Sequence, residues 1–149
     1  MNQKRLQELY KFFLEQRGEP TFSKKVDNQV ILNWENKLPS SLLHIWQGLG
    51  WCSFYNGLLW IVNPDEYQYL MDTCLENTKY QQLDNFYCIA RTAFGEYLLY
   101  GERTKRIIEI QSQYNNFAHK NWGIPKNYIL FTTGEGEDGY FYNVDDNSV

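Results

Sequence analysis

The sequence predicts an α+β fold, in which N-terminal helices pack on a mostly antiparallel, meandering β-sheet. Three observations lead to this expectation. The first half of the chain places apolar residues at helical spacing, and the second half consists of short apolar segments separated by turn residues. Strands that follow one another after a group of helices are typical of an antiparallel sheet. Finally, 149 residues, of which 43% are hydrophobic, suit one domain with a real core.

Two helices are expected in the first fifty residues. The first has apolar residues at spacings of three and four, namely Leu6, Leu9, Tyr10, Phe13 and Leu14. Gly18 and Pro20 should end it. The second helix begins at Pro39, which suits a first helical position, and ends at Gly50. Its apolar stripe consists of Leu42, Ile45, Trp46 and Leu49. We expect Trp46 to be a core residue.

The segment "GLLWIVNPDEYQYLM" combines apolar residues with two carboxylates. Residues 58–62 suit a buried strand with Trp60 in the core. Asn63 is a good N-cap, and Glu66 lies three residues later, as in a capping box. Asp65 and Glu66 also complement the positive end of a helix dipole, so we interpret them as structural rather than catalytic. The apolar stripe of this helix is Tyr67, Leu70, Met71, Cys74 and Leu75.

Strand signals fill the rest of the chain. Residues 85–93 and 97–102 should form a hairpin that turns at Gly95, because glycine supplies the backbone freedom of a tight turn. Another turn at residues 102–105 leads into a strand in "RIIEIQSQ". The segments "NYILFTT" and "GYFYNV" flank "GEGED" and again resemble a hairpin.

Composition excludes several classes of protein. The net charge of −4 argues against a nucleic-acid binder, which needs a basic face. No apolar segment approaches the length of a membrane helix, and the N-terminal segment lacks the apolar core of a signal peptide. We therefore expect no membrane association and a cytoplasmic location. Cys52, Cys74 and Cys88 form no CxxC pair and are interpreted as free thiols in a reducing compartment.

No pattern of catalytic or metal-binding residues is present. The two histidines, His44 and His119, belong to no zinc motif, and His44 is expected at the surface or core edge of its helix. The acids of "GEGEDG" would repel phosphate, and the loop lacks the final glutamate of a calcium-binding EF-hand. A hydrolase that uses Glu96, Glu102 or His44 is the weaker alternative. We expect a protein that is not an enzyme and needs no cofactor or metal.

The C-terminal residues form a local acidic segment. Residues 134–149 contain five acids and no Lys or Arg. A solvated surface explains these charges, and a surface for a basic partner is the sharper hypothesis. The candidate partner-binding residues are Glu135, Glu137, Asp138, Tyr140, Tyr142, Asp145 and Asp146.

Two segments resemble the GAD-like domain family. They are "LPSSLLHIWQGLGWCSFYNGLLWIVNPDEYQYLM" and "ARTAFGEYLLYGE", which match the Leu-Pro start, the tryptophan-bearing helix and the strand-to-helix step of that family in the expected order. The resemblance covers about residues 15–117 of a single domain over residues 1–149, and residues 118–149 form an acidic, hairpin-like tail. The family often carries a further immunity domain, whose pattern is not recognised in that tail.

The resemblance implies a role in bacterial competition. Members of the family include immunity proteins of type VI secretion systems, some of which neutralise nuclease toxins, notably DNases. The implied partner is a cognate toxin, whose basic groove an acidic protein could occupy. The alternatives are a SUKH-like immunity protein, suggested by "PKNYILFTTGEGEDGYFYNV" and the "LPxxLxxxW" start, or a non-catalytic interaction or regulatory module.

Overall fold

The computed structural model describes residues 2–111 and 116–118, and this part of the chain folds into five helices and seven strands. The helices are α1 (Gln3–Arg17), α2 (Asn28–Asn33), α3 (Ser40–Leu49), α4 (Pro64–Leu75) and α5 (Tyr80–Leu83). The strands are β1 (Phe22–Lys24), β2 (Trp51–Phe54), β3 (Leu59–Ile61), β4 (Phe86–Thr92), β5 (Glu96–Gly101), β6 (Ile107–Gln111) and β7 (Asn116–Ala118). The expected "NYILFTT" and "GYFYNV" strands lie outside the described residues.

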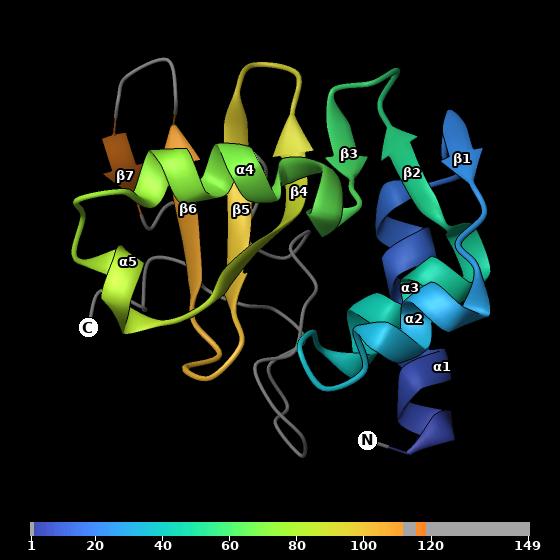
Figure 1. Cartoon of the computed structure of the whole chain (residues 1–149). Coiled ribbons are helices and arrows are strands. Elements are labelled where there is room, and N and C mark those ends of the chain that lie inside the picture. Colours follow the sequence, from blue (N-terminus) through green and yellow to red (C-terminus); the bar gives the residue numbers. More distant parts are fainter. Residues whose placement is uncertain (1, 112–115, 119–149) are drawn as a thin grey trace.

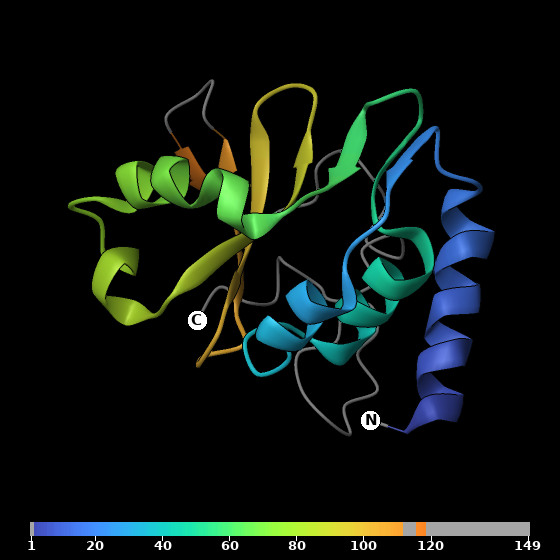
Figure 2. The same ribbon diagram turned by 45° about the vertical axis from the view of Figure 1, so that its right-hand side comes forward.

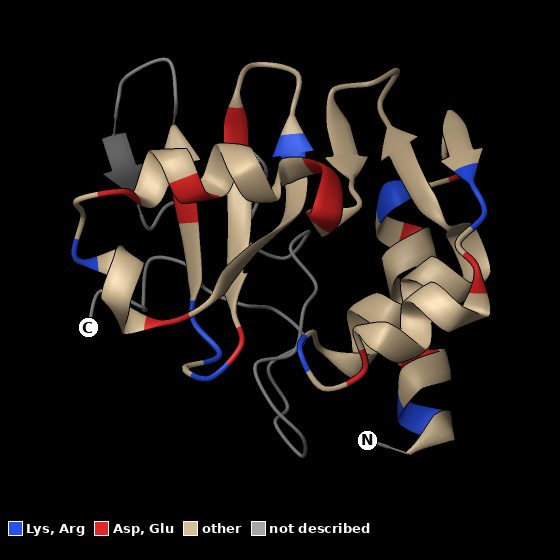
Figure 3. Ribbon diagram, viewed as in Figure 1, with Lys and Arg blue, Asp and Glu red and all other residues tan. Residues whose placement is uncertain are grey.

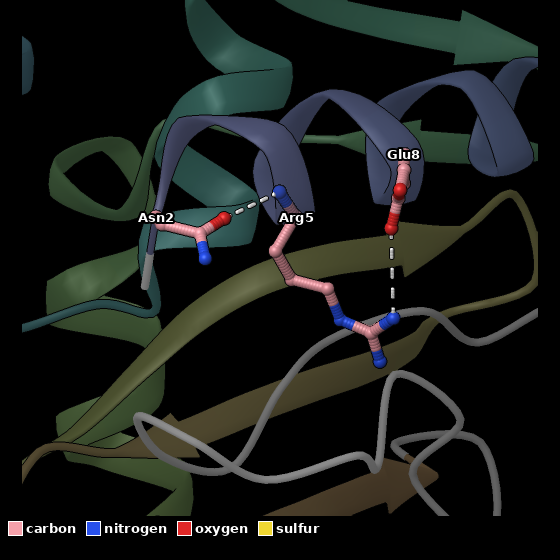
Figure 4. A network of polar contacts seen from close by, with 3 residues as sticks. All are labelled: Asn2, Arg5 and Glu8. Atoms are coloured by element: carbon pink, nitrogen blue, oxygen red, sulfur yellow. Dashed lines mark hydrogen bonds and ion pairs between the residues drawn. The ribbon is translucent and has the colours of Figure 1, made fainter.

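Capping residues fix both ends of helix α1. The Asn2 side chain accepts a hydrogen bond from the backbone N–H of Arg5 at 2.8 Å, and Arg5 pairs with Glu8 at 3.9 Å one turn further on (Figure 4). At the other end, Gly18 has φ +76° and donates its N–H to the carbonyl oxygen of Leu14. The predicted stop at Gly18 is therefore confirmed.

The seven strands form one antiparallel sheet in which each strand pairs with its neighbours in the sequence, from β1 to β7 (Figure 1). Short connections join β2 to β3 and β4 to β5 and β6, because consecutive antiparallel strands need only a tight turn between them, whereas helices connect β1 to β2 and β3 to β4. The predicted turn between β4 and β5 occurs at residues 93–95, and the turn before β6 occurs at residues 102–105. The predicted α+β fold with an antiparallel sheet is confirmed.

Helices cover both faces of the sheet, so the core has two parts. Along β5 the side chains alternate: Leu98 points toward the core shared with α1, α2 and α3, and Leu99 points toward the core shared with α4 and α5. In Figure 1, α4 crosses in front of β4, β5 and β6, whereas β1 and β2 lie beyond its end. Figure 2 shows α1–α3 gathered at the opposite end of the molecule from α5.

The structure confirms most of the predicted core and corrects three details. Trp46 is a core residue, with 1% of its surface exposed. Trp60 is only partly buried, because strand alternation turns it away from Leu59 and Ile61 toward a part of the sheet that α4 does not cover. Leu70 is 38% exposed and lies on the outer side of α4. Pro39 is the N-cap of α3, one residue before its first helical position.

Candidate functional site

The carboxylates at the start of α4 have the structural role that the sequence predicts. The Asn63 side chain accepts a hydrogen bond from the backbone N–H of Asp65 at 3.1 Å, and Pro64 occupies the first turn. Glu66 donates its backbone N–H to the Asn63 carbonyl oxygen at 3.1 Å. Within residues 2–111, the return bond of a capping box, from the backbone of Asn63 to the Glu66 side chain, does not form. Asn63 is thus a confirmed N-cap, and both acids lie at the positive end of the helix.

The outer side of α4 is acidic. Asp65, Tyr69, Asp72 and Glu76 follow one another at spacings of four, three and four residues, so they form one stripe along the helix. All four are exposed, and the Tyr69 side chain is 86% exposed at the centre of the stripe. In Figure 3, α4 carries red acidic segments and no blue basic segment. We call these four residues, with Glu66 and Leu70 beside them, the acidic face.

Two acids of this face lie at the end of the helix that the dipole disfavours for anions. Asp72 lies in the last turn of α4, and Glu76 is its C-cap, where the helix dipole favours cations. The last turn contains no basic residue. A carboxylate at the C-terminal end of a helix lowers the stability of that helix by about 0.3–1 kcal/mol at an exposed site. Both carboxylates are exposed to solvent, and Asp72 also accepts a hydrogen bond from Gln68 within the helix.

A polar hollow adjoins the acidic face. It has a volume of about 310 Å³, and Asp72, Gln68, Asp84 and Tyr87 are among its lining residues. Gln68 donates a hydrogen bond to the Asp72 carboxylate at 2.9 Å, which holds this acid at the rim. The hollow therefore leaves open space beside the Asp72 carboxylate.

Asp84 anchors the loop between β5 and β6 below this hollow. Its carboxylate accepts hydrogen bonds from the backbone N–H groups of Arg103 and Thr104 and from the Thr104 hydroxyl, the last at 2.6 Å. Burial alone would raise the pKa of Asp84, but these hydrogen bonds together with one from Asn85 outweigh it and hold the pKa below its ordinary value. Asp84 is therefore ionised and has a structural role in holding this loop.

The residues of the alternative hydrolase hypothesis do not come together. His44 lies in α3 with its ring against Tyr10 at a centroid distance of 5.4 Å, as expected for a core-edge histidine. Glu96, at the start of β5, accepts a hydrogen bond from the Thr92 hydroxyl at 3.1 Å. Glu102 follows the other end of β5 and accepts one from Tyr87 at 2.8 Å. Burial and this carboxylate raise the pKa of Tyr87 to about 12.

The cysteines are free thiols, as the sequence predicts. Burial raises the pKa of Cys52 and of Cys88 to about 12, so both stay protonated and unreactive at neutral pH. Across residues 2–111 and 116–118, no group of three His, Cys, Asp or Glu side chains is arranged to hold a metal ion. No helix in the same residues has the length and apolar character needed to cross a membrane.

The partner-binding residues proposed from the sequence lie outside the described residues. They are Glu135, Glu137, Asp138, Tyr140, Tyr142, Asp145 and Asp146. The described residues 2–111 contain twelve Lys and Arg and thirteen Asp and Glu, a net charge of −1. The sequence analysis did not identify Tyr69, Asp72 and Glu76. The apolar stripe of α4 implies that these residues lie on the opposite, exposed side of the helix, so the helical periodicity could have revealed them.

Comparisons with known proteins identify the fold and the family. A crystal structure of Atu4351 from Agrobacterium tumefaciens is similar to this one, with a TM-score of 0.62 and 19% sequence identity. The alignment covers 78% of this chain and 53% of that one, so this chain spans about half the length of its structural relative. No curated protein matches the sequence. The family model for the GAD-like domain matches residues 8–114, which include the strand-to-helix step and the acidic helix described above, and the chain therefore belongs to the GAD-like domain family.

Proposed function

We propose that this protein is an immunity protein, which binds a cognate toxin of a bacterial type VI secretion system and neutralises it in the cytoplasm. The toxin is a nuclease of the DNase class, and the protein acts without catalysis by covering the active-site groove. Membership of the GAD-like family supports a small protein-interaction module. The observation that carries the choice of partner is the acidic face of α4.

The chemistry of that face suits a basic partner. A nuclease must present Lys and Arg to the phosphates of its substrate. The carboxylates of Asp72 and Glu76 would steer such a groove toward α4, and the exposed ring of Tyr69 would provide a contact that loses its water on binding. The acids at positions 135–146 would add to the same attraction.

The proposal is tested with candidate nuclease toxins of type VI secretion systems, including any that is encoded next to this gene. We expect co-expression to restore growth of cells that make the toxin, and the two proteins to co-purify. In the double variant Asp72→Asn with Glu76→Gln, association should slow several-fold at low salt, with a flatter salt dependence. Asparagine at position 72 can still accept the hydrogen bond from Gln68, so the fold is preserved.

The matched control removes two negative charges from another surface of the protein. Glu15 in α1 and Glu35 after α2 are also exposed and lie on elements that pack on the other face of the sheet. Glu15→Gln with Glu35→Gln should leave association unchanged. Equal slowing in both double variants would show that only net charge matters and would remove the acidic face from the proposal.

The acidic tail is tested in the same assay. Replacement of Glu135, Glu137 and Asp138 with Ser should also slow association and flatten its salt dependence. An unchanged rate at low salt would mean that the described domain alone forms the contact.

The second candidate is a non-catalytic regulatory module that binds another protein. Family membership supports it as well as it supports immunity. Growth rescue distinguishes the two, because a regulatory module would bind its partner without restoring growth. A SUKH-like immunity protein against a different class of toxin would rescue growth, but the toxin that it neutralises would not cut nucleic acid.

A further inference from the structure

A continuous row of side chains crosses the sheet on the face that carries α4. The strand register places one residue from each neighbouring strand in this row, in the order Phe22, Ser53, Trp60, Arg91 and Tyr97. Tyr67 of α4 covers the Arg91 end, where its hydroxyl accepts a hydrogen bond from the Arg91 Nε at 2.7 Å. The Phe22 end lies beyond α4, and no helix of the described residues covers Phe22 on this face (Figure 1).

The uncovered part forms a groove with aromatic walls. Its volume is about 160 Å³, and Phe22, Trp51 and Trp60 line it. Phe22 is 53% exposed, and its ring contacts that of Trp60 at a centroid distance of 5.8 Å. The Trp60 ring is fixed in place, because its N–H donates a hydrogen bond to the carbonyl oxygen of Gly57 at 2.8 Å. A rigid aromatic surface of this kind is typical of a binding hot spot.

Two cations stand over these rings. The Arg91 guanidinium lies 5.1 Å from the centroid of Trp60, and the Lys24 ammonium lies 5.9 Å from that of Trp51. In the described part of the chain, the acceptors of Arg91 are Tyr67 and, through a long hydrogen bond of 3.4 Å, the carbonyl oxygen of Thr92. Among residues 2–111, no carboxylate is within ion-pair distance of either cation. Both therefore retain the capacity to bind an anion.

We propose that this cationic groove binds an acidic segment of a partner protein. A carboxylate of the partner pairs with Arg91 or Lys24, and a neighbouring apolar side chain rests on Trp60 and Phe22. The groove meets the acidic face at Glu66, but its cations select the opposite charge, so the inference goes beyond neutralisation of a basic toxin.

Other occupants fit the groove less well. A volume of about 160 Å³ is below the roughly 300–1,000 Å³ of small-molecule pockets, and suits one anchoring side chain. A cationic side chain would be repelled by Arg91 and Lys24. Nucleic acid is disfavoured because its binding needs an extended basic surface, and residues 2–111 carry no net positive charge.

The test uses short capped peptides in which one phenylalanine lies between two glutamates, two glutamines or two lysines. Binding is followed by NMR of the tryptophan indole N–H groups in the full chain. We expect the glutamate peptide to shift the Trp60 and Trp51 signals in a saturable way, the glutamine peptide to bind more weakly, and the lysine peptide not to bind. The signal of the fully buried Trp46 is the internal control.

Variants at exposed positions separate binding from folding. Lys24→Gln should weaken binding of the glutamate peptide by about twofold to fivefold, the range of an exposed ion pair. Lys25→Gln removes the same charge from the next exposed residue, which does not line the groove, and should leave affinity unchanged. Phe22→Ala should weaken binding of both the glutamate and the glutamine peptide.

Several outcomes would overturn the proposal. Equal binding of the glutamate and glutamine peptides would remove the role of the cations, and tighter binding of the lysine peptide would indicate a cation-binding aromatic site. Absence of a shift at millimolar peptide would show that the groove is not a binding site. A Trp60 signal that depends on protein concentration would place a second copy of this chain in the groove. None of these results depends on whether the protein neutralises a toxin.

Discussion

Gly50 allows β1 to approach β2, and its replacement by alanine tests this packing directly. Gly50 ends α3 with φ +75° and ψ −162°, a backbone conformation that is almost confined to glycine. A Cβ atom at this position would collide with the carbonyl oxygen of Lys24, and it would lie 2.8 Å from the Lys24 carbonyl carbon and 3.2 Å from the Lys25 Cα. These are backbone atoms, so no side-chain rotation can relieve the contact.

Gly18 provides a control with the same backbone conformation. It ends α1 with φ +76° and ψ −168°, but a Cβ atom there meets no other atom within 4 Å. Gly18→Ala should therefore lower the free energy of unfolding by about 1–3 kcal/mol, the usual cost of this conformation for a residue other than glycine. Gly50→Ala should lower it by a further amount of about 1–3 kcal/mol, because β1 must shift as in an overpacked core.

Urea unfolding followed by tryptophan fluorescence measures this difference. The two variants should keep the slope of the parent and differ in midpoint, with Gly50→Ala the lower. Since β1 contributes Phe22 and Lys24 to the cationic groove, Gly50→Ala should also weaken binding of the glutamate peptide, and Gly18→Ala should not. Equal destabilisation by the two substitutions would refute the close approach of β1 to Gly50.

Three further predictions concern single side chains. Trp46→Ala should lower the free energy of unfolding by about 3–5 kcal/mol, and Trp60→Ala should lower it by less than half as much, because Trp46 is fully buried and Trp60 is not. Urea titration compares the two variants. Equal losses of stability would contradict the partly exposed placement of Trp60. Asn63→Ala should lower the free energy of unfolding by about 1 kcal/mol through loss of the N-cap. The toxin affinity of the folded protein, measured by calorimetry, should stay unchanged. A large loss of affinity without a loss of stability would show that Asp65 and Glu66 contribute to binding. The pKa of Asp84 is lower in the folded protein than in the unfolded chain, so its stabilising contribution is present above the unfolded pKa and is lost as the pH falls through the folded value. Asp84→Asn should therefore reduce stability at neutral pH and weaken its decline in acid, and a melting series across this range would contradict the assignment if parent and variant declined in parallel.

The helix ends and hairpin turns could be predicted from local chemistry. Asn63 caps α4, Gly18 ends α1, and the chain turns at Gly95 as the sequence indicates. Each of these features depends on residues within a few positions of one another, so no knowledge of distant contacts is needed. The short strands β1, β2 and β7 and the short helices α2 and α5 escaped prediction, because three to six residues contain too little periodicity to be recognised.

The direction of individual side chains depended on what covers each element. Trp60 lies in the middle of an apolar segment, and its sequence alone suits a core residue. The structure shows that its side of the sheet extends beyond α4, which leaves the ring partly exposed. Leu70 follows the apolar spacing of α4 but lies at the edge of the stripe, where its position around the helix axis points it toward solvent. Burial is decided by the partner surface, which a local pattern does not contain.

The sequence by itself determined the fold class, the family, the structural role of Asn63 and the excess of acidic residues. Only the tertiary structure placed Phe22, Trp60 and Arg91 in one row, although they are separated in the chain by up to about seventy residues. It also showed that the four acidic and aromatic positions of the α4 stripe all face solvent. The physical reason is that capping and turn formation are local, whereas a shared surface requires strand register and helix packing to bring distant side chains together.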